Sequence, residues 1–189
     1  MKNFKIVWSS RSECGPNRKK NEDSIYPLTS GNNPPPFKAA VCDGLGGHVN
    51  GDIASKIAAD ALDQEFEDLN KIINQANSQI LKFQDDNPES LGMGTTMTVV
   101  TINEDALMKI GHVGDSRCYV LSDRNLVKVT EDQNVPGYQN VLKQALGSNE
   151  KLNMNGQPAK FICVIALILH FQYPLVYRLC MCSTFQVYQ

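Results

Sequence analysis

The stretch from Val41 to His48, which reads VCDGLGGH, constrains this chain more than any other. An apolar run from Phe37 to Cys42 ends in one carboxylate, Asp43, and a glycine-rich turn and a helical pattern follow it. This order predicts a strand, a turn and a helix. A carboxylate at the end of a buried strand is partly desolvated, which is unfavourable unless a positive charge lies beside it. Because glycines let backbone groups approach a ligand closely, we interpret the stretch as one wall of a metal site.

Two phosphate-binding motifs also contain glycine-rich turns, but neither matches this stretch. The dinucleotide fingerprint needs glycine at its sixth position, which is Val49 when counted from Gly44. A Walker loop needs a Gly-Lys-Ser or Gly-Lys-Thr sequence, which does not occur. An ordinary tight turn with a solvated aspartate stays open as the alternative on these residues alone.

Composition narrows the class of protein. A length of 189 residues suits one domain with a real core, and a formal net charge of −2 indicates neither a nucleic-acid nor an anionic-membrane partner. The first residues lack an apolar core long enough for a signal peptide. The six cysteines are scattered and form no Cys-x-x-Cys pair, so we expect no zinc ribbon and a cytoplasmic location. Cys42 and Cys118 lie in apolar runs and are expected to be buried as small hydrophobic residues.

The order of the apolar runs predicts an α+β fold. Short strands with short polar turns between them indicate an antiparallel meander. Two amphipathic stripes indicate helices that pair side by side. A turn is expected at Gly31–Pro36, and a short last helix at Val141–Leu146, ended by Gly147. The strands are expected at Phe4–Trp8, Ser24–Leu28, Phe37–Cys42, Thr95–Ile102, Ala106–Val113, Arg117–Leu121 and Leu126–Val129, and the main helices at Gly51–Phe66 and Lys71–Phe83.

The chain changes character after Lys160. Residues 161–189 contain one charged residue, Arg178, and their longest apolar run is too short to span a bilayer as a helix. Two alternatives stay open for this segment: a buried strand, or a tail that does not belong to the fold. We therefore divide the chain into a domain of residues 1–160 and an atypical apolar tail of residues 161–189.

Acidic residues lie where several expected strands begin or end, namely Glu22, Asp23, Asp43 and Asp115. If these strands pair as antiparallel sheets, their turns can converge at one end. Two carboxylates about 4 Å apart repel by roughly 4 kcal/mol at an effective dielectric constant of about 20, so a cluster of them calls for a cation. Ligands that are all oxygens favour Mg²⁺ or Mn²⁺ over zinc.

Arg18 lies four residues before Glu22 and is suited to hold an oxyanion bidentately beside such metals. An arginine next to an oxygen-ligated metal pair is typical of phosphoester hydrolysis.

Four motifs along the chain carry a family resemblance. They are Arg18-x-x-Asn21-Glu22-Asp23, Asp43-Gly44-x-Gly46-Gly47-His48, Gly94-Thr95-Thr96 and Val113-Gly114-Asp115-Ser116-Arg117. In this order they resemble the PPM family, the metal-dependent serine/threonine protein phosphatases of type 2C, in its compact bacterial form. Weaker similar motifs follow at Thr130–Gln133 and Gln144–Gly147, so the resemblance covers residues 2–147.

The resemblance implies a four-layer sandwich of two antiparallel β-sheets flanked by helix pairs, with two Mg²⁺ or Mn²⁺ ions at one end. Asp43 would bridge both metals, while the Gly44 carbonyl and Glu22 would serve one of them, with Asp23 close behind. Asp115 would belong to a third, weaker metal site. Arg18 would bind the phosphate, and water between the metals would attack phosphorus in line without a phosphoenzyme. The implied partner is a phosphoprotein substrate of a serine/threonine kinase, and we expect a monomer.

Other residues of the motifs have structural interpretations. Thr95 and Thr96 are expected to be buried hydrogen-bonding residues, and Ser116 and Arg117 to brace their turn. His48 is open to two interpretations, a general acid or a structural cap.

The resemblance stops before the end of the chain. Family members continue to a Ser-Asp-Gly motif and an Asp-Asn pair that ligate the second metal, and neither occurs here. The fold is therefore expected to be incomplete, as in a chain truncated at the C-terminus. Three functions stay open: a metal-dependent phosphatase, an inactive relative that acts as a binding or regulatory module, and a generic α+β domain whose acids are turn residues.

Overall fold

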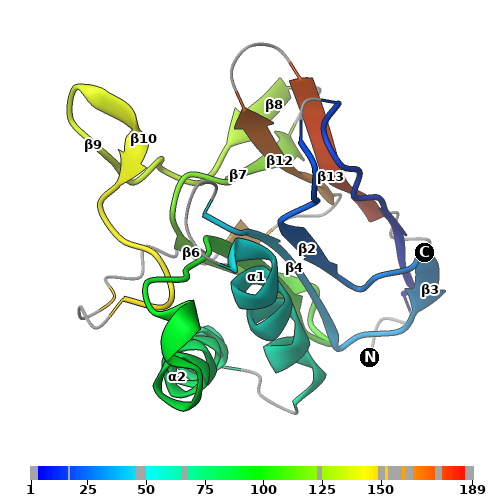
Figure 1. Cartoon of the computed structure of the whole chain (residues 1–189). Coiled ribbons are helices and arrows are strands. Elements are labelled where there is room, and N and C mark those ends of the chain that lie inside the picture. Colours follow the sequence, from blue (N-terminus) through cyan, green and yellow to red (C-terminus); the bar gives the residue numbers. More distant parts are fainter. Residues whose placement is uncertain are drawn as a thin grey trace.

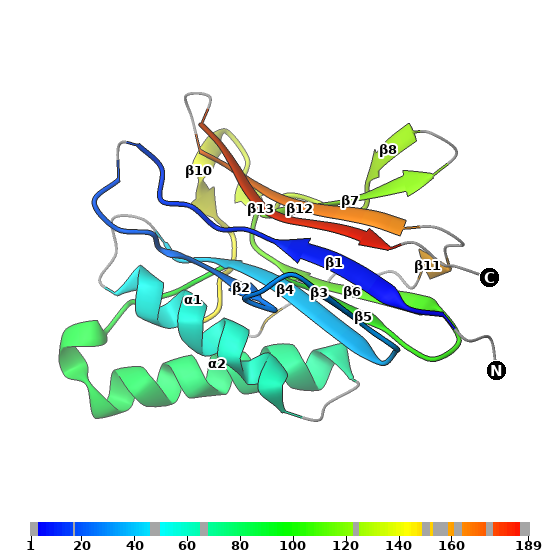
Figure 2. The ribbon, with the colours of Figure 1, turned by 90° about the vertical axis from the view of Figure 1, so that its right-hand side faces the viewer.

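The computed structural model describes residues 4–16, 18–45, 50–64, 68–122, 125–148, 152, 159–160, 164–172 and 176–185. In this part of the chain two antiparallel sheets face each other, and two helices cover the outer face of one sheet (Figure 1, Figure 2). The predicted α+β class is confirmed. The described residues form three of the four expected layers, which agrees with the prediction of an incomplete sandwich.

The five-stranded sheet carries the helices. Its strands lie in the order β11 (Ala159–Lys160), β6 (Leu107–Val113), β5 (Met97–Ile102), β4 (Phe37–Asp43) and β2 (Asp23–Tyr26), and every neighbouring pair is antiparallel. Ala39 and Val41 of β4 belong to the core between the sheets, whereas Ala40 and Cys42 belong to the core under the helices. Burial on both faces explains why β4 is a continuous apolar run.

The six-stranded sheet contains the last two strands of the chain. Its order is β3 (Gly31–Asn33), β1 (Ile6–Ser10), β13 (Val176–Phe185), β12 (Val164–Gln172), β7 (Arg117–Ser122) and β8 (Asn125–Lys128). β13 pairs with β1, and β12 pairs with β7. Of the two alternatives for the segment after Lys160, the structure therefore shows strands in these two ranges. The division at residue 160 and the origin of residues 161–189 stay predictions.

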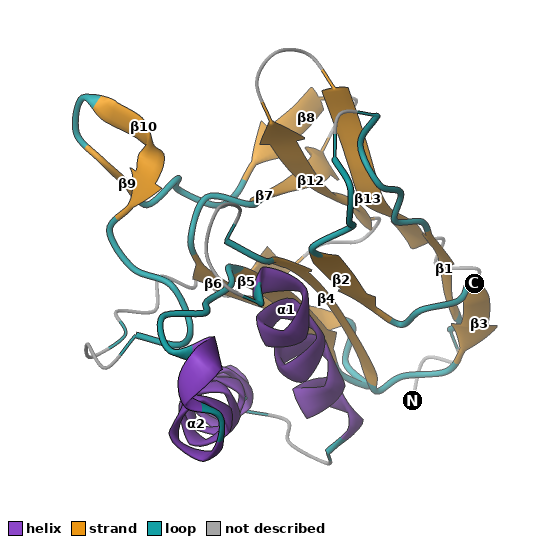
Figure 3. Cartoon of the chain, in the orientation of Figure 1, coloured by secondary structure: helices purple, strands orange, loops and turns teal. Residues whose placement is uncertain are grey.

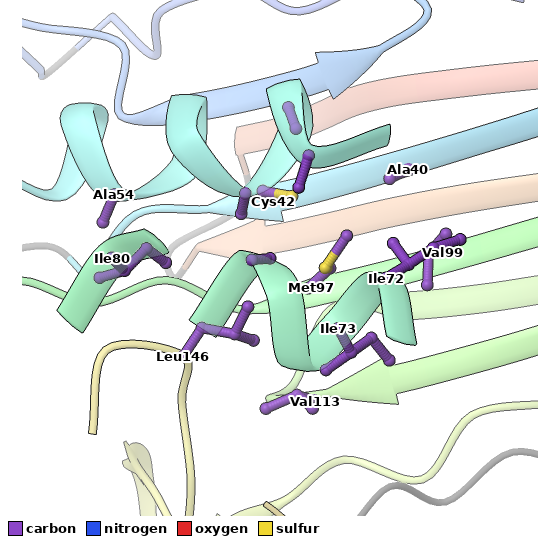
Figure 4. Close-up of a cluster of buried hydrophobic side chains, with 14 of the residues drawn as sticks. Ala40, Cys42, Ala54, Ile72, Ile73, Ile80, Met97, Val99, Val113 and Leu146 are labelled. Atoms are coloured by element: carbon purple, nitrogen blue, oxygen red, sulfur yellow. The ribbon is translucent and has the colours of Figure 1, made fainter. Parts of the chain in front are cut away.

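The two helices lie side by side on the five-stranded sheet, as predicted (Figure 3). α1 (Gly51–Asp60) runs into the 3₁₀ turn η1 (Ala61–Asp63), and α2 (Leu69–Asp86) is followed by η2 (Pro88–Ser90). The Asp68 side chain caps α2 by accepting a hydrogen bond from the Asn70 amide. Ile72, Ile73 and Ile80 of α2 pack on the sheet beside Met97 and Val113 (Figure 4). Among the described residues, no helix is both long enough and apolar enough to cross a membrane.

The prediction of a turn over Gly31–Pro36 is wrong in its first half. Residues 31–33 form β3, whose register with β1 pairs Trp8 with Gly31 and Ile6 with Asn33. The Trp8 indole N–H also donates to the Thr29 carbonyl at 2.8 Å. These contacts with β1 are long-range, so the local glycine and proline pattern did not reveal them.

The prediction of a helix over Val141–Leu146 is wrong. β10 (Tyr138–Leu142) pairs with β9 (Asn134–Val135) in a hairpin that projects from the body (Figure 1). Leu146 instead bridges to Thr95 through backbone hydrogen bonds in both directions. Six residues are too few for a helix to be stable without tertiary contacts, and here those contacts favour extended backbone.

We predict that Ile73→Ala lowers the free energy of unfolding by about 2–5 kcal/mol, because it leaves a cavity between α2 and the sheet. Ile73 is fully buried, and its Cδ1 lies 2.8 Å from where a Cβ at Gly111 would be. Urea denaturation measures the change. The control is Leu91→Ala at a side chain that is 75% exposed, for which we expect a change within about 0.5 kcal/mol. Equal losses in both variants would contradict the described core.

Candidate functional site

Four residues at strand ends form one row across the five-stranded sheet. Asp23 lies opposite Asp43 in the register of β2 and β4. The Thr96 amide donates to the Asp43 carbonyl at 2.9 Å, and the register of β5 and β6 continues the row to Gly114. Residues in one row share a face of the sheet. Val41 lies two residues before Asp43 on the same face, and it belongs to the core between the sheets. The row therefore faces the end of the space between the two sheets.

The two aspartates of this row are both buried, with Asp23 7% exposed and Asp43 8% exposed. Two carboxylates held on neighbouring strands and shielded from water repel each other unless a cation or proton compensates. The structure thus brings together Asp23 and Asp43, two of the three aspartates that the sequence predicted as site residues. Their role as metal ligands stays a prediction.

Gly44, Glu22 and Ser55 form a tight backbone junction beside Asp43. The Gly44 amide donates to the Glu22 carbonyl at 3.0 Å, and the Ser55 hydroxyl donates to the same oxygen at 2.6 Å. A Cβ at Gly44 would lie 2.2 Å from the Gly51 carbonyl oxygen, so only glycine fits. Ser55, on α1, was not predicted from the sequence, because only the fold brings α1 onto Glu22.

Arg18 lies at the exposed edge of the same region. Its Nη1 is 3.9 Å from Glu22 Oε2, with the two side chains 37% and 21% exposed. The structure therefore places Arg18 beside Glu22, and the predicted role of Arg18 in phosphate binding stays a prediction. A contact of this length between partly exposed charges is weak.

Asp115 lies in the turn that joins β6 to β7 and so links the two sheets. Its Oδ2 accepts a hydrogen bond from Asn134 Nδ2 at 3.0 Å. Gly114 has a φ of 108°, and a Cβ there would lie 2.5 Å from Thr96 Cγ2. The Ser116 hydroxyl lies 2.9 Å from the Thr96 hydroxyl, so Ser116 braces the turn as expected.

Gln133 fastens the base of the projecting hairpin to this turn. Its Oε1 accepts from the Gly114 amide at 2.7 Å and from Gln144 Nε2 at 2.8 Å. The backbone N–H of Gln133 donates to the Gly114 carbonyl at 2.9 Å. Gln133 and Gln144 lie in the two weaker motifs, but the sequence did not indicate that they meet, and Asn134 lies just outside those motifs.

Arg117 braces the turn through an ion pair with Asp132. Arg117 Nε and Nη2 lie 2.9 Å and 2.6 Å from Asp132 Oδ2, and Lys128 Nζ lies 3.2 Å from Oδ1. Partial burial opposes ionisation of Asp132, but the hydrogen bonds and charges of Arg117 and Lys128 outweigh it. They hold the pKa of Asp132 below its ordinary value of 3.8.

His112, on β6, connects β5 and β6 to the segment between β8 and β9. Its Nε2 is 3.0 Å from the Glu131 carbonyl oxygen, which only accepts, so Nε2 carries the proton of the neutral ring. Nδ1 then accepts from the Thr98 hydroxyl at 2.8 Å. Burial lowers the pKa of His112 below its ordinary value of 6.5, despite the Glu131 carbonyl and nearby aspartates that favour the charged ring.

Among the other predicted site residues, Glu22 and Gly44 adjoin the Asp23–Asp43 pair, and Asp115 follows Gly114 of the same row. Within the described ranges, no three His, Cys, Asp or Glu side chains are grouped so that they could hold a metal ion together. Gly46, Gly47 and His48 of the glycine-rich turn lie outside those ranges. The two interpretations of His48 therefore stay predictions.

Comparison with known proteins decides the family. The model of the family described as "Protein phosphatase 2C" matches residues 9–136, which is more than half of the chain. The chain belongs to the protein phosphatase 2C family. The matched range includes each predicted site residue, and the resemblance found in the four motifs is confirmed.

Sequence relatives of this type 2C chain are bacterial serine/threonine phosphatases. It is 34% identical over 136 residues to the serine/threonine protein phosphatase PstP of Mycobacterium tuberculosis, a match that covers 67% of this chain and 25% of PstP. It is 33% identical over 138 residues to the serine/threonine phosphatase stp of Listeria welshimeri, covering 66% of this chain and 54% of stp. The chain thus spans from a quarter to about half of the length of these curated relatives.

Solved structures show the same type 2C fold. The crystal structure of the Mycobacterium tuberculosis phosphatase PstP/Ppp matches with a TM-score of 0.72 at 25% identity, over 87% of this chain and 78% of that chain. The PstP catalytic domain in complex with two manganese ions matches with a TM-score of 0.71 at 26% identity, over 87% of this chain and 77% of that chain.

We predict that Gly114→Ala destabilises the protein more than Gly92→Ala. Both glycines have positive φ, so each alanine should cost about 1–2 kcal/mol in backbone strain. The Cβ at residue 114 would also overlap the Thr96 side chain, whereas a Cβ at residue 92 would meet nothing within 4 Å. Overpacking adds about 1–3 kcal/mol for Gly114→Ala alone. Urea denaturation compares the two, and equal losses would contradict the described contact.

We predict that the protein loses stability as the pH falls through the ordinary pKa of histidine. A folded-state pKa below the unfolded value of 6.5 means that His112 stabilises the fold fully above pH 6.5 and less as pH falls toward the lowered pKa. The urea concentration at the unfolding midpoint should therefore decrease when the pH is lowered from about 7.5 to about 5.5. His112→Gln is the control, since glutamine does not titrate there. An equal pH dependence in both proteins would show that another group is responsible.

Proposed function

We propose that this chain hydrolyses phosphoserine and phosphothreonine in proteins, with Mg²⁺ or Mn²⁺ bound at Asp43. The observation that carries the proposal is the pairing of buried Asp23 and Asp43 across two strands, beside a glycine that no other residue could replace. The family and the named activities of its relatives support the substrate class. The manganese ions in the PstP catalytic domain support the choice of metal.

The donor atoms at this end of the sheets suit a hard divalent cation. They are carboxylate and backbone carbonyl oxygens, which Mg²⁺ and Mn²⁺ prefer. Asp43, Glu22 and the Gly44 carbonyl would hold the ions, with Asp23 close behind. Asp115 would belong to a third, weaker site. The register that sets Asp23 opposite Asp43, with Glu22 and Gly44 as their chain neighbours, supports this assignment.

Divalent ions at such a site supply an activated water and neutralise charge on the phosphate. The chain's own residues position the metal-binding carboxylate and the phosphate. The Asp43 amide donates to Thr96 Oγ1 at 3.0 Å, which holds the end of β4 in place. Arg18 would bind two phosphate oxygens with its planar guanidinium and so orient phosphorus for in-line attack by water.

The proposal extends to the setting of the reaction. We propose that the substrates are phosphorylated by a serine/threonine kinase and that the chain acts as a monomer in the cytoplasm. The nearly balanced charge and the scattered cysteines support this setting. Each proposed site residue lies in the domain of residues 1–160.

The test is hydrolysis of a phosphothreonine peptide across a Mn²⁺ titration. We expect activity that depends on Mn²⁺, and a loss of about 100-fold or more in Asp43→Asn, because a ligand to the metal is removed. Asp105→Asn is the control, an exposed aspartate in the turn between β5 and β6. Mn²⁺ should also raise the melting temperature of the parent but not of Asp43→Asn.

Two results would contradict the proposed function. One is a folded parent that shows neither hydrolysis nor stabilisation at any Mn²⁺ concentration. The other is an Asp43→Asn variant that is as active as the parent.

A further inference from the structure

Thr96 lies between the two predicted metal-binding aspartates, Asp43 and Asp115. Its hydroxyl oxygen accepts a hydrogen bond from the Asp43 amide at 3.0 Å. The same oxygen lies 2.9 Å from the hydroxyl of Ser116, the residue that follows Asp115. Thr96 is 1% exposed and Ser116 is fully buried, so this hydrogen-bonded link runs through the protein interior.

The methyl group of Thr96 makes a second contact with the same turn. A Cβ at Gly114 would lie 2.5 Å from Thr96 Cγ2 and 2.7 Å from Thr96 Cβ. The Gly114 backbone therefore rests directly on this side chain. A close-packed interior transmits small displacements, since little free volume can absorb them. A shift of the end of β4 would therefore displace the turn that carries Asp115.

Thr95 differs from Thr96, although it is adjacent and equally buried. Its hydroxyl donates to the Thr96 carbonyl at 2.9 Å and takes no part in the link between Asp43 and Ser116. The chain therefore offers a matched control for the loss of one buried hydroxyl.

We propose that Thr96 is a positioning residue that couples Asp43 to Asp115. Binding of a divalent cation at Asp43 and a change at Asp115 therefore influence each other. The inference rests on the proposed function for the identity of the cation. The link itself is a property of the metal-free chain, so it can be tested separately. Coupling of this kind is reciprocal: a change at Asp115 alters cation affinity at Asp43 by the factor that cation binding transmits back.

Three variants separate the parts of the side chain. Thr96→Val keeps the shape and the methyl group but removes the hydroxyl that the Asp43 amide and Ser116 use. Thr96→Ser keeps the hydroxyl and removes the methyl group. Thr95→Val removes a neighbouring hydroxyl outside the link and reports the general effect of such a loss on stability.

The first measurement is amide hydrogen exchange in the metal-free protein. We expect the amides of Asp43 and of residues 114–117 to exchange about tenfold faster or more in Thr96→Val, relative to amides of α2, because the link has lost its central hydrogen bonds. In Thr96→Ser and Thr95→Val these amides should stay close to the parent. Equal acceleration in Thr95→Val, or none in Thr96→Val, would overturn the link.

The second measurement is Mn²⁺ affinity by electron paramagnetic resonance. In the parent, Thr96→Ser and Thr95→Val backgrounds, Asp115→Asn should change Mn²⁺ affinity at Asp43 by about fivefold or more. In the Thr96→Val background the same substitution should have almost no effect, as a double-mutant cycle would show. An equal factor in all four backgrounds would overturn the coupling.

The two measurements separate the two proposals. A folded parent that does not bind Mn²⁺ would refute the proposed function and with it the coupling of a cation to Asp115. The exchange rates would still decide whether Thr96 links the two aspartates.

Discussion

The hydrogen-bonded register of β4 between β2 and β5 is the constraint on which the rest of the structure depends. Alternate residues of β4 fill the core between the sheets and the core under the helices. The same alternation turns Asp43 toward the space between the sheets, opposite Asp23 and Thr96. A slip by one residue would exchange these faces, burying the carboxylate under α1 and exposing Cys42 to the site. The core and the candidate site are therefore determined together.

The turn between β6 and β7 has a second, equally constrained role. It joins the two sheets at the end where the aspartates lie. Hydrogen bonds hold it to Thr96 of the five-stranded sheet and to Gln133 and Asn134 at the base of the hairpin. The backbone amide and carbonyl of Gly114 are thus both paired without regular sheet structure. A rigid connection at this point lets residues from separate parts of the chain keep a common geometry, which a site with several ligands requires.

The proposed chemistry follows from a contrast in burial. The carboxylates of Asp23 and Asp43 are shielded from water, whereas Arg18 lies at the exposed edge beside Glu22. Buried carboxylates favour tight interaction with a cation, because water competes little for either partner. An exposed guanidinium can meet a phosphate that arrives from solvent. This arrangement suits the proposed role of this type 2C chain, which is similar to relatives named as serine/threonine phosphatases.

The sequence by itself determined the strand that ends in Asp43, the two helices, the β5–β6 and β7–β8 hairpins and the family, because these depend on local periodicity and on motif order. Tertiary structure alone decided that residues 31–33 and 138–142 are strands, and that β12 and β13 lie between β1 and β7. It also decided the contacts of Ser55 with Glu22 and of Asn134 with Asp115, which join residues 33 and 19 positions apart. Such contacts leave no local pattern. They arise because buried backbone and polar groups must find partners, wherever along the chain those partners lie.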